Sequence, residues 1–313
     1  MSNKLLVVIG GPTGIGKTDV AIRLAQHFHT EIISADSRQV YKELNIGVGR
    51  PNPDQLATVP HHMIGHVSIF EDYSVARFTD DVLSLLNQLF QKHNIVILTG
   101  GTGLYVKAII EGFDDIPEVE KEITDKWTSF WNENGTEALA EVLKKIDPSY
   151  FEKVDPANPR RMIRALGVSD STGQPFSTFL KGEKQVRPFK SLPIVLDLPR
   201  KELYARIDQR VLNMIEHGWE QEARALLPYK HLKALDTVGY KEFFAYFEGK
   251  SNLEETISSI QQSTRRYAKR QLTWWRHQGQ WHSFSPEDFD SIINVIKDKN
   301  AQGARGMEQG EVL

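Results

Sequence analysis

Residues 11–18 read Gly-Pro-Thr-Gly-Ile-Gly-Lys-Thr and directly follow the apolar run Leu-Leu-Val-Val-Ile at residues 5–9. The spacing Gly-x-x-x-x-Gly-Lys-Thr between a buried strand and a helix is typical of a phosphate-binding loop. Several backbone N–H groups converge on one point in such a loop, and the N-terminus of the helix adds partial positive charge there. Lys17 can neutralise a phosphate, and the Thr18 hydroxyl can bind Mg²⁺. The sequence therefore predicts a polyphosphate site.

Strand and helix patterns alternate over the first third of the chain. Residues 5–9, 31–35 and 95–99 are predicted strands, whereas residues 18–28 and 74–92 carry apolar residues at helical spacing and residues 50–62 read as a loop. This alternation predicts an α/β fold, with a parallel sheet flanked by helices. Ligands of such sheets bind at the carboxyl ends of the strands. We therefore expect the phosphate loop, Asp36 and Thr102 to face one cleft.

The pattern changes between residue 114 and about residue 190, where charged helical segments are interrupted by prolines. A strand returns at residues 192–198, followed by helices at about 200–217, 219–227, 240–248 and 253–276. We predict a catalytic core formed by residues 1–113 and 191–300, with a helical insertion domain at residues 114–190. Residues 301–313 are rich in Gly, Gln and Glu and are predicted to form a disordered tail.

The composition of the 313-residue chain, with 40% hydrophobic and 25% charged residues, is that of a soluble globular protein. The chain has no cysteine, which excludes disulfides, Cys-bound zinc and thiol catalysis. We see no signal peptide and no apolar run near the ~20 residues that cross a bilayer. These features favour a cytoplasmic protein that makes no membrane contact.

The net charge of −3 argues against general nucleic-acid binding, but the charge is unevenly distributed. No acidic residue lies between Glu255 and Glu287, where the basic residues are Arg265, Arg266, Lys269, Arg270 and Arg276. A local basic surface on a mildly acidic protein indicates a site for a polyanion.

Asp36 ends the second predicted strand, beside the phosphate loop. A carboxylate at this position could accept a proton or hold Mg²⁺, but Asp is also a favoured N-cap of a helix, and both interpretations stay open. Residues 99–105, Thr-Gly-Gly-Thr-Gly-Leu-Tyr, lack the acidic residue that many ATPases carry after this strand, which weakens a hydrolase interpretation. Its glycines and Thr102 could approach a ligand or form a tight turn before a helix.

Arginines stand one helical turn apart in two segments. Arg160, Arg161 and Arg164 follow an Asn-Pro pair that favours a helix start, and they form either a solvated face or a nucleic-acid contact. Arg206 and Arg210 could form surface ion pairs, or either could bind a pyrophosphate bidentately.

A third basic segment, residues 263–276, interleaves bases and aromatics. On a helix it presents one polar stripe suited to a phosphate backbone, formed by Arg266, Lys269, Arg270 and Thr273. At least one of Trp274 and Trp275 is predicted to be a core residue.

Taken together, these motifs resemble those of the tRNA dimethylallyltransferase (tRNA isopentenyltransferase) family, in the same order over nearly the whole chain. The phosphate loop is generic, but Asp-Ser-Arg-Gln-Val-Tyr at 36–41 combined with Tyr-Ala-Lys-Arg-Gln at 267–271 is specific. Further matching stretches are Gly-Gly-Thr-Gly-Leu-Tyr at 100–105, Asn-Pro-Arg-Arg-Met-Ile-Arg-Ala-Leu at 158–166, Thr-Gly-Gln-Pro at 172–175 and Val-Gly-Tyr-Lys-Glu at 238–242. Gly167 departs from the pattern, because the family usually has Glu there.

The resemblance implies a P-loop NTPase-like fold and transfer of a dimethylallyl group from dimethylallyl pyrophosphate to N6 of the adenosine just 3′ of the anticodon, in tRNAs that read codons starting with U. Lys17, Thr18, the cofactor Mg²⁺ and Arg210 would stabilise the departing pyrophosphate. Asp36 would accept the amine proton, and Thr102 would support the same cleft. The implied pyrophosphate or nucleotide (ATP) site comprises Gly11, Pro12, Thr13, Gly14, Ile15, Gly16, Lys17 and Thr18.

The implied macromolecular partner is the tRNA anticodon stem-loop, whose adenosine leaves the base stack to reach the cleft. The implied RNA contacts are Asp36, Ser37, Arg38, Gln39, Thr102, Arg160, Arg161, Arg164, Arg266, Lys269 and Arg270. We expect the protein to act as a monomer. Two alternatives stay open: an adenylate isopentenyltransferase, which modifies a free nucleotide, and a P-loop small-molecule kinase, which uses ATP. Neither alternative needs an insertion domain that grips RNA.

Overall fold

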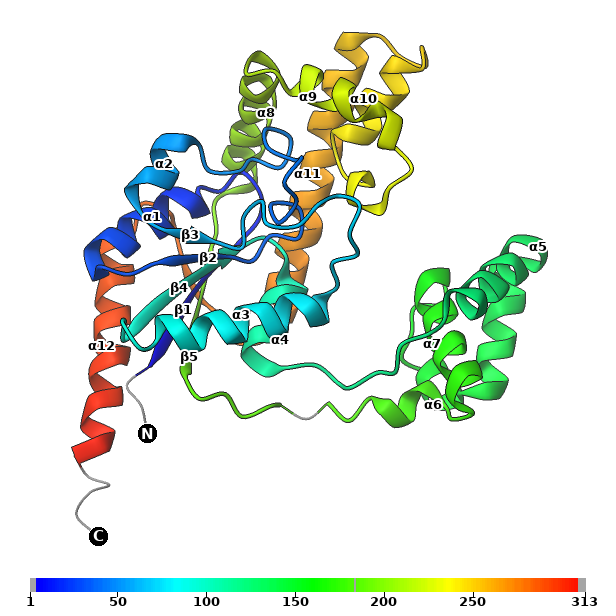
Figure 1. Ribbon diagram of the computed structural model, residues 1–313, viewed down its shortest axis with the longest axis horizontal. Coiled ribbons are helices and arrows are strands. Elements are labelled where there is room, and N and C mark those ends of the chain that lie inside the picture. The colour runs from blue at the N-terminus through cyan, green and yellow to red at the C-terminus, as the bar shows by residue number, and fades with distance from the viewer. Residues whose placement is uncertain (1–3, 183, 309–313) are drawn as a thin grey trace. The chain divides into compact units, whose positions relative to one another are not determined.

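The computed structural model describes residues 4–182 and 184–308, with side chains as far as residue 302. Its contacts divide the chain into two compact units, one that ends at Ile110 and resumes at Arg187, and one that spans Glu111–Val186 (Figure 1). We call the first unit the core and the second the insert. The predicted boundaries for the same division were residues 113/114 and 190/191.

The core is built on one parallel sheet, whose strands in the described part of the chain follow the order β3-β2-β4-β1-β5-β6. Their bounds are β1 Leu5–Gly10, β2 Ile32–Ser34, β3 His61–His62, β4 Ile95–Gly100, β5 Lys190–Leu196 and β6 His282–Phe284. The two central strands end together, because Gly10 pairs with Gly100 in register. The predicted α/β fold with a parallel sheet is confirmed.

Helices cover both faces of the sheet, which explains why β1 is buried along its whole length. Leu5, Val7 and Ile9 pack on one side with α1 and α12, and Leu6 and Val8 pack on the other with α3 and α4. The helices of this unit are α1 Lys17–Phe28, α2 Pro53–Thr58, α3 Val75–Leu89, α4 Gly103–Glu111, α8 Arg200–Glu216, α9 Trp219–Leu226, α10 Tyr240–Phe247, α11 Leu253–His277 and α12 Phe289–Glu308.

Two parts of the core differ from the sequence prediction. Residues 50–62, predicted as a loop, contain α2 and β3, and α2 begins at a capping box between Asn52 and Gln55. The predicted disordered tail is wrong for its first part, because α12 continues through Glu308. The rest of that prediction, residues 309–313, lies outside the described residues.

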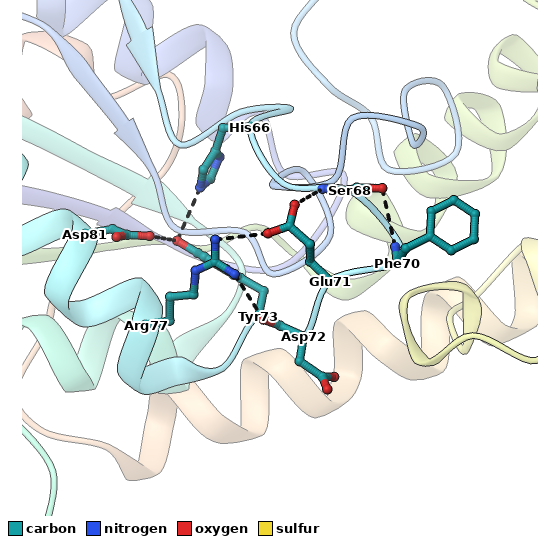
Figure 2. A network of polar contacts seen from close by, with 8 residues as sticks. All are labelled: His66, Ser68, Phe70, Glu71, Asp72, Tyr73, Arg77 and Asp81. Atoms are coloured by element: carbon teal, nitrogen blue, oxygen red, sulfur yellow. Dashed lines mark hydrogen bonds and ion pairs between the residues drawn. The ribbon is translucent and has the colours of Figure 1, made fainter.

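The connection between β3 and α3 is tied together by polar contacts, which Figure 2 shows from close by. The Ser68 N–H donates to Glu71 Oε1 at 3.1 Å, and the Arg77 guanidinium donates to Glu71 Oε2 at 3.1 Å. The Tyr73 hydroxyl donates to Asp81 Oδ2 at 2.8 Å. These contacts fix the course of the chain between the sheet edge and α3.

The insert has an apolar core of its own, formed by α5 Lys121–Ile146, α6 Pro148–Phe151, α7 Pro159–Thr172 and the 3₁₀ turn Phe176–Phe179. Asp147 is 1% exposed, and its carboxylate accepts from the Ser177 N–H at 2.6 Å and the Ser177 hydroxyl at 2.7 Å. Gly167 faces Val119, and a Cβ there would stand 3.0 Å from Val119 Cγ1. A side chain at this position would therefore require Val119 to shift slightly.

No helix in residues 4–182 and 184–308 is long and apolar enough to span a membrane.

Candidate functional site

A cavity of about 1010 Å³ opens at the carboxyl ends of β1, β2 and β4, and it is lined by residues of the core alone. The phosphate loop forms one wall, the segment after β2 forms a second, and α8 and α11 complete it. Of the predicted site residues in the core, those that line it are Thr13, Gly14, Gly16, Lys17, Thr18, Asp36, Ser37, Arg38, Gln39, Arg210, Arg266 and Arg270.

The phosphate loop turns sharply from β1 into α1. Gly14 and Gly16 have φ of 80° and 98°, a region that favours glycine, and a Cβ on Gly14 would also stand 2.8 Å from Ile207 Cγ1. Ile15 is fully buried in the core, so this member of the predicted site acts through packing and does not line the cavity. Gly11 and Pro12 do not line the cavity either, although the Pro12 carbonyl accepts from Lys17 Nζ at 2.7 Å.

Lys17, Asp36 and Arg210 interact electrostatically within the cavity. Burial lowers the pKa of Lys17 to about 7, with Asp36 raising the value and Arg210 lowering it. Burial also lowers the pKa of Arg210, while Asp36 and Asp19 oppose that shift. The Arg210 guanidinium lies against Gly49, where any side chain would overlap it. The site therefore holds two partly buried basic side chains beside one carboxylate.

The structure gives Asp36 a capping role, although the segment that it caps is a turn and not a helix. Its Oδ1 accepts from the backbone N–H groups of Arg38 at 2.9 Å and Gln39 at 3.3 Å, so it caps a turn rather than a helix. No described residue donates to Oδ2, and the carboxylate lines the cavity. One oxygen is thus structural, and the other remains available to a ligand.

Thr102 supports the Asp36 segment from outside the cavity lining. Its hydroxyl oxygen accepts from the Ser37 N–H at 2.9 Å and donates to Ser37 Oγ at 3.2 Å, and its N–H donates to the Ala35 carbonyl at 3.2 Å. The predicted tight turn before a helix is therefore present, since α4 begins at Gly103.

Arg38 and Gln39 are committed to holding the cavity wall. The Arg38 guanidinium donates to the carbonyls of Lys233, Ala234 and Asp236 at 3.1–3.3 Å. The Gln39 amide donates to the Gly49 carbonyl at 3.0 Å and to that of Val48 at 3.4 Å. Both side chains were predicted to contact RNA. In the structure they hold the cavity wall in place.

On α8 and α11, some of the predicted basic residues have acidic partners and others do not. Arg206 pairs with Glu202 at 2.7 Å, and Arg265 pairs with Asp208. Arg266 and Arg270 are exposed at the cavity and pair with no carboxylate of the described residues. Lys269 is exposed but does not line the cavity.

The sequence analysis missed Tyr267 and Gln271, which lie one turn apart on α11 and both line the cavity. Burial, together with the charge of Asp36, raises the pKa of Tyr267 to about 12, so its hydroxyl stays protonated at neutral pH. Gln271 is 7% exposed. Trp275 is 2% exposed, as predicted for a core residue. Gln271 is a polar residue that lies one helical turn before Trp275, and this spacing is the signal that could have identified it.

Within the insert, α7 presents a basic face. Arg160, Arg161 and Arg164 are exposed and make no ion pair with the described carboxylates, although Arg164 donates to the Pro117 carbonyl at 3.3 Å. The side chain of Asn158 caps the helix by accepting from the Arg161 N–H at 3.3 Å. Among the described residues, no cluster of three or more His, Asp or Glu side chains could hold a metal ion.

A parallel sheet with a Gly-Lys-Thr loop opening into a cavity that also holds an aspartate and an arginine defines a P-loop protein of the group-transfer class. Residues 39–278 match the family model described as IPP transferase, and the chain belongs to this family. It is therefore an enzyme of the prenyltransferase class, as the resemblance predicted.

Curated relatives match over almost the full chain. The chain is 48% identical over 301 residues to the tRNA dimethylallyltransferase of Christiangramia forsetii, covering 96% of this chain and 99% of that protein. It is 43% identical over 295 residues to tRNA dimethylallyltransferase 1 of Bacteroides thetaiotaomicron, covering 94% and 96%.

Solved structures are similar as well. The tRNA isopentenylpyrophosphate transferase of Bacillus halodurans superposes with a TM-score of 0.72 at 34% identity, covering 98% of this chain and all of that one. A eukaryotic dimethylallyltransferase described as acting on tRNA superposes with a TM-score of 0.74 at 31% identity, covering 87% and 69%.

Proposed function

We propose that this protein transfers the dimethylallyl group of dimethylallyl pyrophosphate to N6 of the adenosine just 3′ of the anticodon, in tRNAs that read codons starting with U. The products are N6-(dimethylallyl)adenosine and pyrophosphate. The observation that carries the proposal is that a single cavity contains a phosphate loop, two partly buried basic side chains and a carboxylate with one oxygen that no described residue contacts. The names of the relatives support the choice of substrates.

On the donor side, the phosphate loop would hold the pyrophosphate as it leaves. Negative charge develops on the bridging oxygen when the carbon–oxygen bond breaks, and the basic side chains of Lys17 and Arg210 both line the cavity. Because both side chains are partly buried, their attraction for that charge is screened less than at an open surface. Stabilisation of the leaving group is therefore the larger contribution that we assign to this site.

On the acceptor side, Asp36 would orient the exocyclic amine of adenine and take its proton. This amine is a poor nucleophile because its lone pair is delocalised into the ring, so removal of the proton assists attack on the allylic carbon. General-base catalysis is typically worth ~10²–10⁴-fold. The Asp36 oxygen without a partner in the described residues suits this role.

The oxygen ligands that Mg²⁺ prefers are present on the cavity wall at Thr18 and Asp36. We propose that Thr18 holds the ion, which when bound would neutralise part of the charge of the pyrophosphate. We further propose that Arg266 and Arg270 on α11, and Arg160, Arg161 and Arg164 on α7, contact the phosphates of the anticodon stem-loop. Lys269, which is exposed on α11, would bind the same RNA outside the cavity. A cytoplasmic monomer is the form that we propose.

A transfer assay with three acceptors tests the function. The protein is incubated with radiolabelled dimethylallyl pyrophosphate, Mg²⁺ and either unmodified tRNA, AMP or ATP. We expect label in tRNA alone. Label in AMP or ATP without label in tRNA would contradict the proposal and favour an adenylate isopentenyltransferase. Absence of label from all three acceptors would also contradict it and would leave the small-molecule kinase as the alternative.

A further inference from the structure

Gln271 connects the loops that follow two neighbouring strands, β1 and β4. Its Oε1 accepts from the Thr13 N–H in the phosphate loop at 2.9 Å, and its Nε2 donates to the Gly101 carbonyl in the turn after β4 at 2.9 Å. The side chain is 7% exposed, and a Cβ on Gly101 would overlap its amide. The carboxamide therefore has one fixed orientation, in which its acceptor and its donor are both used.

Each of these two loops supports a different half of the proposed reaction. Thr13 belongs to the loop that continues to Lys17 and Thr18, on the leaving-group side. Gly101 precedes Thr102, whose hydroxyl holds Ser37 beside the proposed base Asp36. Gln271 is thus a hydrogen-bonded link between the leaving-group site and the segment that holds the base.

The helix that carries Gln271 is itself packed against the sheet. Trp275 lies over Gly10 at the end of β1, where a Cβ would stand 2.7 Å from the indole ring, and Trp274 lies against Gly103 at the start of α4. This contact leaves α11 no room to shift toward the sheet, which restricts the movement of Gln271 in that direction.

We propose that Gln271 is a positioning residue, which fixes the spacing between the phosphate loop and Asp36 so that the allylic carbon and the adenine amine meet. The proposal rests on the proposed function. A misplacement of about 1 Å between reacting groups costs ~10²-fold in rate. Loss of either hydrogen bond is therefore expected to lower kcat far more than the affinity for either substrate.

The first variant is Gln271→Met, which keeps the length and apolar stem of the side chain and removes both hydrogen bonds. We expect kcat to fall by ~10²-fold, with KM for dimethylallyl pyrophosphate within a few-fold of wild type. Thermal denaturation reports whether the variant folds. The matched control is Gln262→Met, an exposed residue on the same helix that does not line the cavity, and it is expected to change neither constant.

The second variant, Gln271→Glu, separates positioning from packing through its pH profile. A protonated Glu accepts from the Thr13 N–H and donates to the Gly101 carbonyl as Gln does, whereas an ionised Glu has no proton for Gly101. Burial raises the pKa of a carboxyl group. The activity of the variant relative to wild type should therefore fall as pH rises through that pKa.

A readout independent of turnover is hydrogen exchange at the Thr13 amide. We expect faster exchange in Gln271→Met than in wild type or Gln262→Met. Faster exchange together with a ~10²-fold lower kcat would support the proposal. A Gln271→Met variant with wild-type kcat, or a Gln271→Glu variant with the wild-type pH profile, would overturn it. Failure of wild-type protein to modify tRNA would instead contradict the proposed function, and so the two failures are distinguishable.

Discussion

At the scale of single residues, the account depends on two charged groups of the site, Asp36 and Lys17. Asp36 uses Oδ1 to cap a turn, which leaves Oδ2 for chemistry. Lys17 has a pKa of about 7 because burial outweighs the attraction of Asp36. Both residues can therefore be tested by changes that separate their structural and chemical contributions.

Asp36→Asn and Asp36→Ala separate the cap from the base. Asn retains an oxygen acceptor for the two backbone N–H groups, and Ala does not. We expect both variants to lose ~10²–10⁴-fold in kcat, whereas only Ala should lose about 1 kcal/mol of unfolding free energy. Single-turnover kinetics and chemical denaturation measure the two quantities, and near-wild-type kcat in Asp36→Asn would rule out the general-base role.

The lowered pKa of Lys17 predicts that the protein takes up a proton when pyrophosphate binds. Below pH 7 the amine is already charged, and above pH 7 the anion restores the charge that burial disfavours, so a proton is taken up. Calorimetry in two buffers of different ionisation enthalpy, without Mg²⁺, measures this uptake. At pH 8.5, wild type should take up about one proton more than Lys17→Met, and an equal uptake by both proteins would contradict the assignment.

At the scale of elements, length and polarity decided which features could be predicted. The buried strands β1 and β4 follow from continuous apolar runs. The long helices α8 and α11 follow from apolar periodicity, because each carries enough residues for the pattern to repeat. The strands β3 and β6 have two and three residues, partly polar and exposed, and so leave no such pattern. The convergence of Lys17, Thr18 and Asp36 was predictable from the ends of parallel strands.

The contribution of Gln271 could not be predicted, because it depends on a contact with Thr13, which is 258 residues away in sequence. The hydrogen bonds of Arg38 to the carbonyls of residues 233, 234 and 236 span a similar separation. Motif spacing reports chemistry along one segment, whereas these contacts arise only when the segments fold together.

On α11, we predict that arginines with and without acidic partners differ in their contribution to RNA binding. Arg266→Gln and Arg270→Gln should each weaken binding of the anticodon stem-loop and reduce the slope of log affinity against log salt by ~1. Arg265→Gln, which removes the partner of Asp208, is the control and should leave that slope unchanged. Equal slopes for the three variants in a salt titration would show that α11 does not contact the RNA backbone.

At the scale of the whole molecule, the chain has two units with separate apolar cores and separate basic surfaces. If both units bind one RNA, removing the charge of one unit weakens RNA binding without altering the pyrophosphate site. We expect the triple substitution Arg160→Gln, Arg161→Gln and Arg164→Gln to raise KM for tRNA by ~10-fold or more, because several phosphate contacts are lost. KM for dimethylallyl pyrophosphate should stay within a few-fold, and an unchanged KM for tRNA would remove the insert from the RNA interface.

Nucleoside analysis of a modified stem-loop tests the central claim most directly. An unmodified anticodon stem-loop is incubated with the protein, dimethylallyl pyrophosphate and Mg²⁺, then digested and examined by mass spectrometry. A second stem-loop, which carries guanosine in place of the adenosine just 3′ of the anticodon, is treated in the same way. The account predicts N6-(dimethylallyl)adenosine from the first RNA and none from the second. Absence of the modified nucleoside from the first RNA, or its formation from both, would contradict it.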